Sequence, residues 1–62
     1  MLSQDALKIV IKVAELRLNR PQKPSKAIQD FVANAIQNSE GKTEERLKLL
    51  KIWKEIDERR KQ

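Results

Sequence analysis

Two prolines and one glycine divide this chain of 62 residues into segments, and this division limits its fold more than any other feature of the sequence. Pro21 and Pro24 bracket a short connector, which we expect to be extended because a residue that precedes proline avoids helical geometry. Gly41 can adopt the left-handed conformation with which many helices end, so we expect it to terminate the segment before it. The chain should therefore fold as segments joined at the prolines and at the glycine.

Each segment begins with the start signal of an α-helix. Ser3, Ser25 and Thr43 precede apolar residues that recur with helical periodicity, and their side-chain oxygens can accept a hydrogen bond from the first turn. We therefore predict an all-α fold, a compact three-helix domain. The helices are expected at about residues 3–19, 25–39 and 43–60 of a single domain, 1–62.

Residues 7–13 also fit a second interpretation. They are rich in β-branched side chains and partly alternate with lysines, as a strand does. A lone strand has no pairing partner in this chain, so only a dimer would supply one. The continuation Ala14-Glu15-Leu16 favours a helix. We therefore predict a helix and keep a dimer-paired strand as the alternative.

A domain of this size needs a source of stability besides its core. A chain of about 60 residues buries only roughly 60% of the surface that its unfolded form exposes. Small domains are usually stabilised further by disulfides, a metal or a partner subunit. The chain has no cysteine and no histidine, which excludes disulfides and removes the commonest metal ligands. Association with another chain is the source of stability that remains.

The apolar face of the first predicted helix is wider than packing against two neighbours requires. Its polar side chains occupy an arc of roughly 100°, and apolar side chains fill most of the rest. Exposing such an area is unusual for a soluble monomer. Part of the face has the alternating spacing of a helix–helix seam: Leu2, Ala6, Ile9, Val13 and Leu16. We predict that these residues form a homodimer interface, and keep as alternatives a central position in the bundle or docking of a different protein.

The other two predicted helices carry narrower apolar stripes. The stripe of the second helix consists of Ile28, Phe31, Val32, Ala35 and Ile36. The stripe of the third consists of Leu49, Ile52, Trp53 and Ile56, widened by Leu47 and Leu50. Such stripes normally face a core, so we predict that both aromatic side chains are buried.

The sequence contains no recognisable group of catalytic residues. The serines and the threonine stand where caps or turns need them, and Glu44 and Glu45 suit the positive end of a helix dipole. One glycine cannot build a glycine-rich phosphate loop. We therefore predict that the protein is not an enzyme and uses no cofactor, metal or small-molecule substrate.

The excess of basic residues is the remaining feature of the sequence that indicates a ligand. Lysine and arginine outnumber aspartate and glutamate by 14 to 9, which gives a net charge of +5. Basic residues gather at the connector and at the C-terminus, which we expect to be frayed, and such clusters can hold phosphates. These residues are Arg17, Arg20, Lys23, Lys26, Arg59, Arg60 and Lys61. Against nucleic-acid binding, the third helix carries mixed charges, and the aromatic rings needed for base stacking are expected in the core.

Two DNA-binding folds fit this chain poorly. A helix-turn-helix formed by the second and third helices would place Glu44 and Glu45 against phosphates and repel them. Residues 24–28 open a helix much as the second helix of a ribbon-helix-helix fold begins. That fold also needs a pairing strand, which only residues 7–13 could supply.

We therefore expect a protein that acts by binding a macromolecule. The first hypothesis is an adaptor or regulator that engages a protein partner through apolar surface on the first or third helix. The alternative is a small basic nucleic-acid-binding protein. Lys8, Lys12 and Glu15 interrupt the longest apolar stretch, which argues against a membrane span or a secretory signal. The lack of cysteine then favours the cytoplasm, and association with a membrane surface is disfavoured because the polar arc of the first helix is narrow and not uniformly basic.

Overall fold

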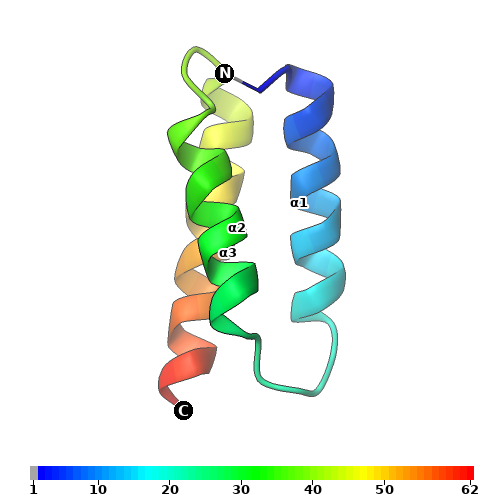
Figure 1. The fold of residues 1–62 in the computed structure, drawn as a ribbon, viewed down its shortest axis with the longest axis vertical. Helices are drawn as coiled ribbons and strands as arrows, with labels where there is room; N and C mark the ends of the chain where they lie inside the picture. The colour runs from blue at the N-terminus through cyan, green and yellow to red at the C-terminus, as the bar shows by residue number, and fades with distance from the viewer. Residues whose placement is uncertain (1) are drawn as a thin grey trace.

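A computed structural model describes residues 2–62, which form three α-helices packed side by side as a bundle (Figure 1). Helix α1 spans Gln4–Leu18, α2 spans Lys26–Gln37 and α3 spans Thr43–Lys61. The prediction of an all-α fold is confirmed, and residues 7–13 belong to α1 and not to a strand. Helices α1 and α3 run in the same direction and α2 runs against them. The α1–α2 connector and the C-terminus therefore lie at one end of the bundle (Figure 1).

The first two helices begin at the residues that the sequence predicts as caps. The Ser3 Oγ accepts a hydrogen bond from the Ala6 backbone N–H at 3.1 Å, and the Ser25 Oγ accepts one from the Ile28 N–H at 3.3 Å. Each bond satisfies a backbone donor that has no partner within its helix. Local sequence is thus sufficient to set where α1 and α2 start.

The turn between α2 and α3 differs from the prediction in two respects. Helix α2 ends at Gln37, so Gly41, with φ of +80°, adopts its left-handed conformation in the turn and not directly after the helix. The Lys42 N–H then donates to the Ser39 carbonyl at 2.9 Å, which brings the chain into α3 with Lys42 at the N-cap position. Thr43 is already helical, so the prediction that it caps α3 was wrong.

All three helices contribute to the core along the axis of the bundle. Its buried members are Leu7, Val10, Ile11, Ala14, Val32, Ala35, Leu49, Ile52 and Ile56. A fully buried leucine, isoleucine or valine stabilises the fold by about 1.5–3 kcal/mol relative to exposure. Partly buried side chains pack against this core: Leu2, Leu18, Ile36 and Trp53. Only one side of the wide apolar face of α1 therefore contributes to the core.

The prediction that both aromatic side chains are buried was wrong for Phe31. Its side chain is 41% exposed, whereas Trp53 is half-buried against the core. Val32 and Ala35 set the inward direction of α2, and Phe31 lies at the edge of that stripe, on the side of α1. Which edge of a stripe stays exposed depends on how far each helix is rotated about its own axis, and the spacing of apolar residues does not specify that rotation.

Candidate functional site

The two basic clusters, which are far apart in the sequence, meet at one end of the bundle. Arg59 is the centre of this meeting: its Nη1 donates to the Leu18 carbonyl at 2.7 Å, and its Nη2 donates to the carbonyls of Arg20 and Gln22 at 3.0 and 2.9 Å. One guanidinium group therefore joins the end of α1 and the connector to α3. A cation is also favourable there because the last carbonyls of a helix carry partial negative charge.

Two further contacts reinforce this end. The Arg60 Nη1 donates to the Pro24 carbonyl at 3.1 Å, and the Lys23 Nζ donates to the Gln62 carbonyl. Arg59 and Arg60 are both half-buried, and α3 continues to Lys61. The expectation of a frayed C-terminus was therefore wrong, because contacts with the connector hold the last turn of α3.

The predicted phosphate-binding residues divide into two groups. Arg59, Arg60 and Lys61 make contacts within the fold, since Lys61 forms an ion pair with Asp57 at 3.0 Å. Three others have exposed side chains to which the described residues 2–62 offer no hydrogen bond or ion pair: Arg17, Arg20 and Lys26. Lys23 is also exposed and has only its contact with the terminal carbonyl.

An open groove of about 360 Å³ lies beside these free cations, between the end of α1 and the start of α2. Its lining includes Arg17, Arg20, Lys23, Ala27, Ile28 and Phe31. No acidic side chain is among the described residues that line it. Lys26 lies on the first turn of α2 outside this lining. The groove, which we call the connector groove, is thus lined by cations and by apolar side chains that include an aromatic ring.

Sequence reasoning placed Phe31 in the core and so missed its part in the connector groove. The sequence gives only a weak indication that Phe31 lies at the edge of the α2 stripe. Phe31 follows Ala27 by one helical turn, which places both residues on the same edge of the α2 stripe. That edge faces α1 at the level of Arg17, a neighbourhood that only the packing of the two helices creates.

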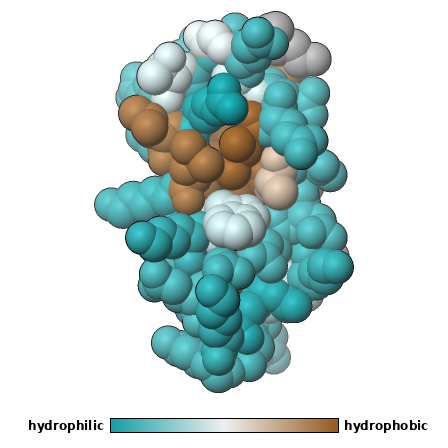
Figure 2. All heavy atoms as spheres, turned by 90° about the vertical axis from the view of Figure 1, so that its left-hand side faces the viewer, coloured by the Kyte–Doolittle hydropathy of each residue, from teal (hydrophilic) through white to brown (hydrophobic). Residues whose placement is uncertain are grey.

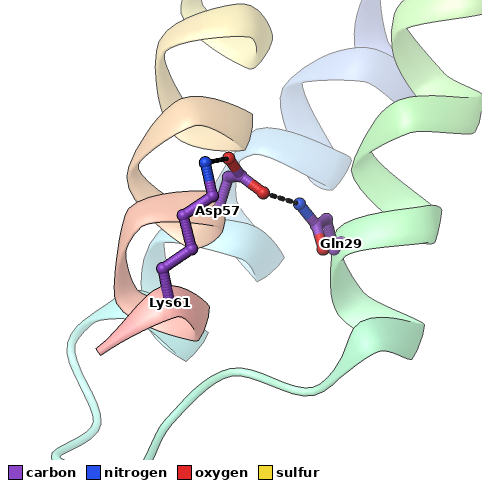
Figure 3. Close-up of polar contacts among 3 residues, drawn as sticks. All are labelled: Gln29, Asp57 and Lys61. Carbon is purple, nitrogen blue, oxygen red and sulfur yellow. Dashed lines mark hydrogen bonds and ion pairs between the residues drawn. The ribbon is translucent and has the colours of Figure 1, made fainter.

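A polar contact joins α2 to α3 near the same end (Figure 3). The Gln29 Nε2 donates to the Asp57 Oδ1 at 3.0 Å, while the Lys61 Nζ lies 3.0 Å from the Asp57 Oδ2. The hydrogen bond from Lys61, followed by that from Gln29, lowers the pKa of the Asp57 carboxyl below its ordinary value. This contact also defines which sides of the two helices face each other.

Farther from the connector, the same boundary between α2 and α3 becomes apolar. On α3, the side that faces α2 contains Asp57 and, four and seven residues before it, Trp53 and Leu50. On α2, the side that faces α3 contains Gln29 and, four and seven residues after it, Ala33 and Ile36. The apolar residues at or beside these positions form a surface that we call the α2–α3 patch: Ala33, Ile36, Leu47, Leu50 and Trp53. Figure 2 shows apolar side chains gathered on this face of the bundle, in the half near the α2–α3 turn.

The α2–α3 patch is apolar at its centre and basic along α3. Leu47 is 62% exposed and Leu50 is 45% exposed, and the other members are half-buried. Two cations of α3 beside them, Arg46 and Lys54, are exposed and form no ion pair within residues 2–62. The charge of Glu44 on the same helix is offset by Lys48, whose Nζ lies 3.5 Å from it.

The predicted dimer interface lies on the surface of α1. Ile9 is 65% exposed and Leu16 is 57% exposed, whereas Leu2, Ala6 and Val13 are half-buried. Ile9 and Leu16 point away from the core because they lie on the opposite side of the helix from buried Leu7. Leu2 is held differently: its N–H donates to the Asn38 carbonyl at 2.9 Å, and its side chain packs against the core. The wide apolar face of α1 thus divides into a core side and an exposed side.

Comparison with protein-family models, curated proteins and solved structures returned no match. Across residues 2–62, no helix has the combination of length and apolar character that crossing a membrane requires. In the same residues, no three Asp or Glu side chains are grouped so as to hold a metal ion. The surfaces described above are therefore the features from which a function can be inferred.

Proposed function

We propose that this protein is a protein-interaction module that pairs with a second copy through the exposed side of α1 and binds a protein partner at the α2–α3 patch. The observation that carries the proposal is the grouping of exposed apolar residues on opposite sides of the bundle. Ile9 and Leu16 lie on one side, and Leu47 and Leu50 lie on the other. Grouped apolar exposure of this kind marks interaction surfaces in small proteins, and here 37% of all residues are charged.

The charges beside each surface favour a different occupant. The exposed charged residues of α1 are two acidic and three basic: Asp5, Glu15, Lys8, Lys12 and Arg17. Their net charge of only +1 allows a second copy to approach with little repulsion. The cations beside the α2–α3 patch would repel the same cations of a second copy and attract an acidic partner. We therefore assign α1 to self-association and the patch to a partner of opposite charge.

The partner that best fits the α2–α3 patch is an amphipathic helix with an apolar face and acidic flanks. The patch runs along the boundary between two helices, as do the grooves in which amphipathic helices dock. It contains Trp53, and tryptophan is among the residue types that contribute most to binding energy. Arg46 and Lys54 lie where they can meet carboxylates on the flank of such a helix.

A designed helical peptide with a leucine face, glutamate flanks and no tryptophan tests the patch directly. We expect the emission of Trp53, the single tryptophan, to shift to shorter wavelength and saturate as the peptide excludes water from the patch. Leu50→Ser should weaken binding at least tenfold, because burying a leucine contributes about 1.5–3 kcal/mol. The fold should tolerate this change, since Leu50 is 45% exposed.

Two controls make this titration decisive. Leu16→Ser removes a leucine of similar exposure from α1 and should leave peptide affinity unchanged. A peptide with lysine flanks in place of glutamates should not bind at equal concentration. The assignment is wrong if wild-type protein does not respond to the glutamate peptide, or if Leu16→Ser weakens binding as much as Leu50→Ser.

A further inference from the structure

We propose that the connector groove binds single-stranded nucleic acid, with one base stacked on Phe31 and the neighbouring phosphates held by Arg17, Arg20 and Lys23. This site is separate from the α2–α3 patch and does not depend on the function proposed above. It rests on a combination that the sequence did not predict, namely an exposed aromatic ring and several free cations in the same groove.

The cations that line the connector groove suit a phosphate backbone. Arg17 comes from the last turn of α1, and Arg20 and Lys23 come from the connector. No acidic side chain among the described lining residues opposes them. The hydrogen bond from Lys23 to the Gln62 carbonyl is exposed, and the lysine has further N–H donors for a phosphate.

The apolar part of the groove lining suits a base. Phe31 is 41% exposed, and Ala27 and Ile28 extend the apolar surface beside its ring. Aromatic side chains on which bases stack, next to a basic path for the backbone, are the shared feature of proteins that bind single strands without sequence preference.

A single strand fits this groove better than a duplex does. Its volume of about 360 Å³ is at the small end of the range of ligand pockets, about 300–1,000 Å³, and its ring can be reached only by a base that has left its stack. The groove is also organised before any ligand arrives, because Arg59 and Arg60 hold the connector carbonyls against α3. Such order reduces the conformational entropy that binding would otherwise remove.

Fluorescence anisotropy of a labelled oligothymidylate, titrated with wild-type protein at low and at physiological salt, tests the proposal. We expect micromolar binding at low salt that weakens as salt rises. The slope of log K against log salt should be about −2, since each of three neutralised phosphates contributes about 0.7. An abasic strand of the same length has the same phosphates and no bases, so it should bind about tenfold more weakly.

Variants separate the contributions of the ring and the cations. Phe31→Leu retains apolar volume and removes the aromatic face, so it should weaken oligothymidylate binding about tenfold and leave abasic-strand binding unchanged. Arg20→Gln should reduce the salt slope by about 0.7. Lys8→Gln removes the same charge from the other end of α1 and should leave the affinity for oligothymidylate nearly unchanged.

Several outcomes would overturn the proposal. Equal affinity for the abasic strand and for oligothymidylate would show an electrostatic surface without base stacking. No binding at low salt would exclude the site. Preference for polyglutamate or for phosphatidylserine vesicles over the oligonucleotide would assign the groove to an acidic peptide or a lipid surface instead. None of these results affects peptide binding at the α2–α3 patch, so the two proposals can fail independently.

Discussion

Arg59 shows how one side chain can hold together parts of the chain that the sequence separates widely. Its guanidinium donates to three carbonyls, which belong to the end of α1 and to the connector. The Leu18 carbonyl is at the C-terminus of α1, where helical carbonyls have no partner within the helix, and the other two lie in the irregular connector. The side chain therefore supplies hydrogen bonds that regular secondary structure does not supply there. The sequence marked Arg59 as a ligand-binding residue, whereas its geometry assigns it a structural role.

Replacing Arg59 tests this role. Arg59→Gln should lower the free energy of unfolding by about 1–3 kcal/mol, because hydrogen bonds from a charged donor are lost and carbonyls are left without partners. Urea unfolding followed by circular dichroism measures the change. Arg46→Gln serves as the control, since Arg46 is exposed without an ion pair in the described residues, and its effect should stay within about 0.5 kcal/mol. Equal effects of the two substitutions would contradict the structural role.

At the scale of the helices, the boundary between α2 and α3 is polar near the connector and apolar near the turn. The Gln29–Asp57 hydrogen bond secures the polar part. The apolar part includes Leu50, which remains 45% exposed. The polar contact holds the two helices in register, while the apolar part leaves Leu47 and Leu50 exposed.

The polar contact makes stability depend on pH. The folded pKa of Asp57 is lowered, first by the hydrogen bond from Lys61 and then by that from Gln29, so folding favours the ionised carboxylate. Its contribution is therefore fully present above the unfolded pKa and is lost as pH falls through the folded pKa. We expect the melting temperature of wild type to fall over this acidic range more than that of Asp57→Asn. Parallel curves for the two proteins would show that the contact does not contribute.

For the molecule as a whole, small size limits how many apolar residues the core can bury, so the others remain exposed. Three helices of this length enclose a core of nine buried apolar residues within the described chain. The apolar residues that this core does not accommodate remain on α1 and along the α2–α3 patch. Small domains commonly cover such surface by association, which is the reason for expecting a dimer.

Sedimentation equilibrium tests the dimer. Wild-type protein should have twice the mass of one chain, and Ile9→Glu should have the mass of a monomer, because a carboxylate would be buried without a partner in the seam. Helicity should persist in the variant, since Ile9 is 65% exposed within one chain. Gln4→Ala is the control on the same helix: it changes an exposed polar side chain without altering the charge, and the variant should remain dimeric. A monomeric wild type, or a dimeric Ile9→Glu, would contradict the prediction.

Much of the local structure could be predicted from the sequence, because the responsible interactions act within a few residues. Ser3 and Ser25 cap their helices with hydrogen bonds to backbone donors three residues later. The helical spacing of apolar residues also predicted which residues α2 and α3 contribute to the core, but it did not single out the four core residues of α1: Leu7, Val10, Ile11 and Ala14. Thr43 was an exception, because the preceding turn brings the chain into α3 one residue earlier.

Only the tertiary structure decided how the faces of the helices are used. The rotation of each helix against its neighbours turned Leu7 inward and Ile9 outward, and left Phe31 at the edge of the core beside Arg17. Packing also brought Arg59 to carbonyls 37 to 41 residues earlier in the chain. The sequence by itself determined the helices, since caps, prolines and periodicity are local signals. It did not determine the connector groove or the α2–α3 patch, because both consist of residues from separate helices whose relative placement no local signal specifies.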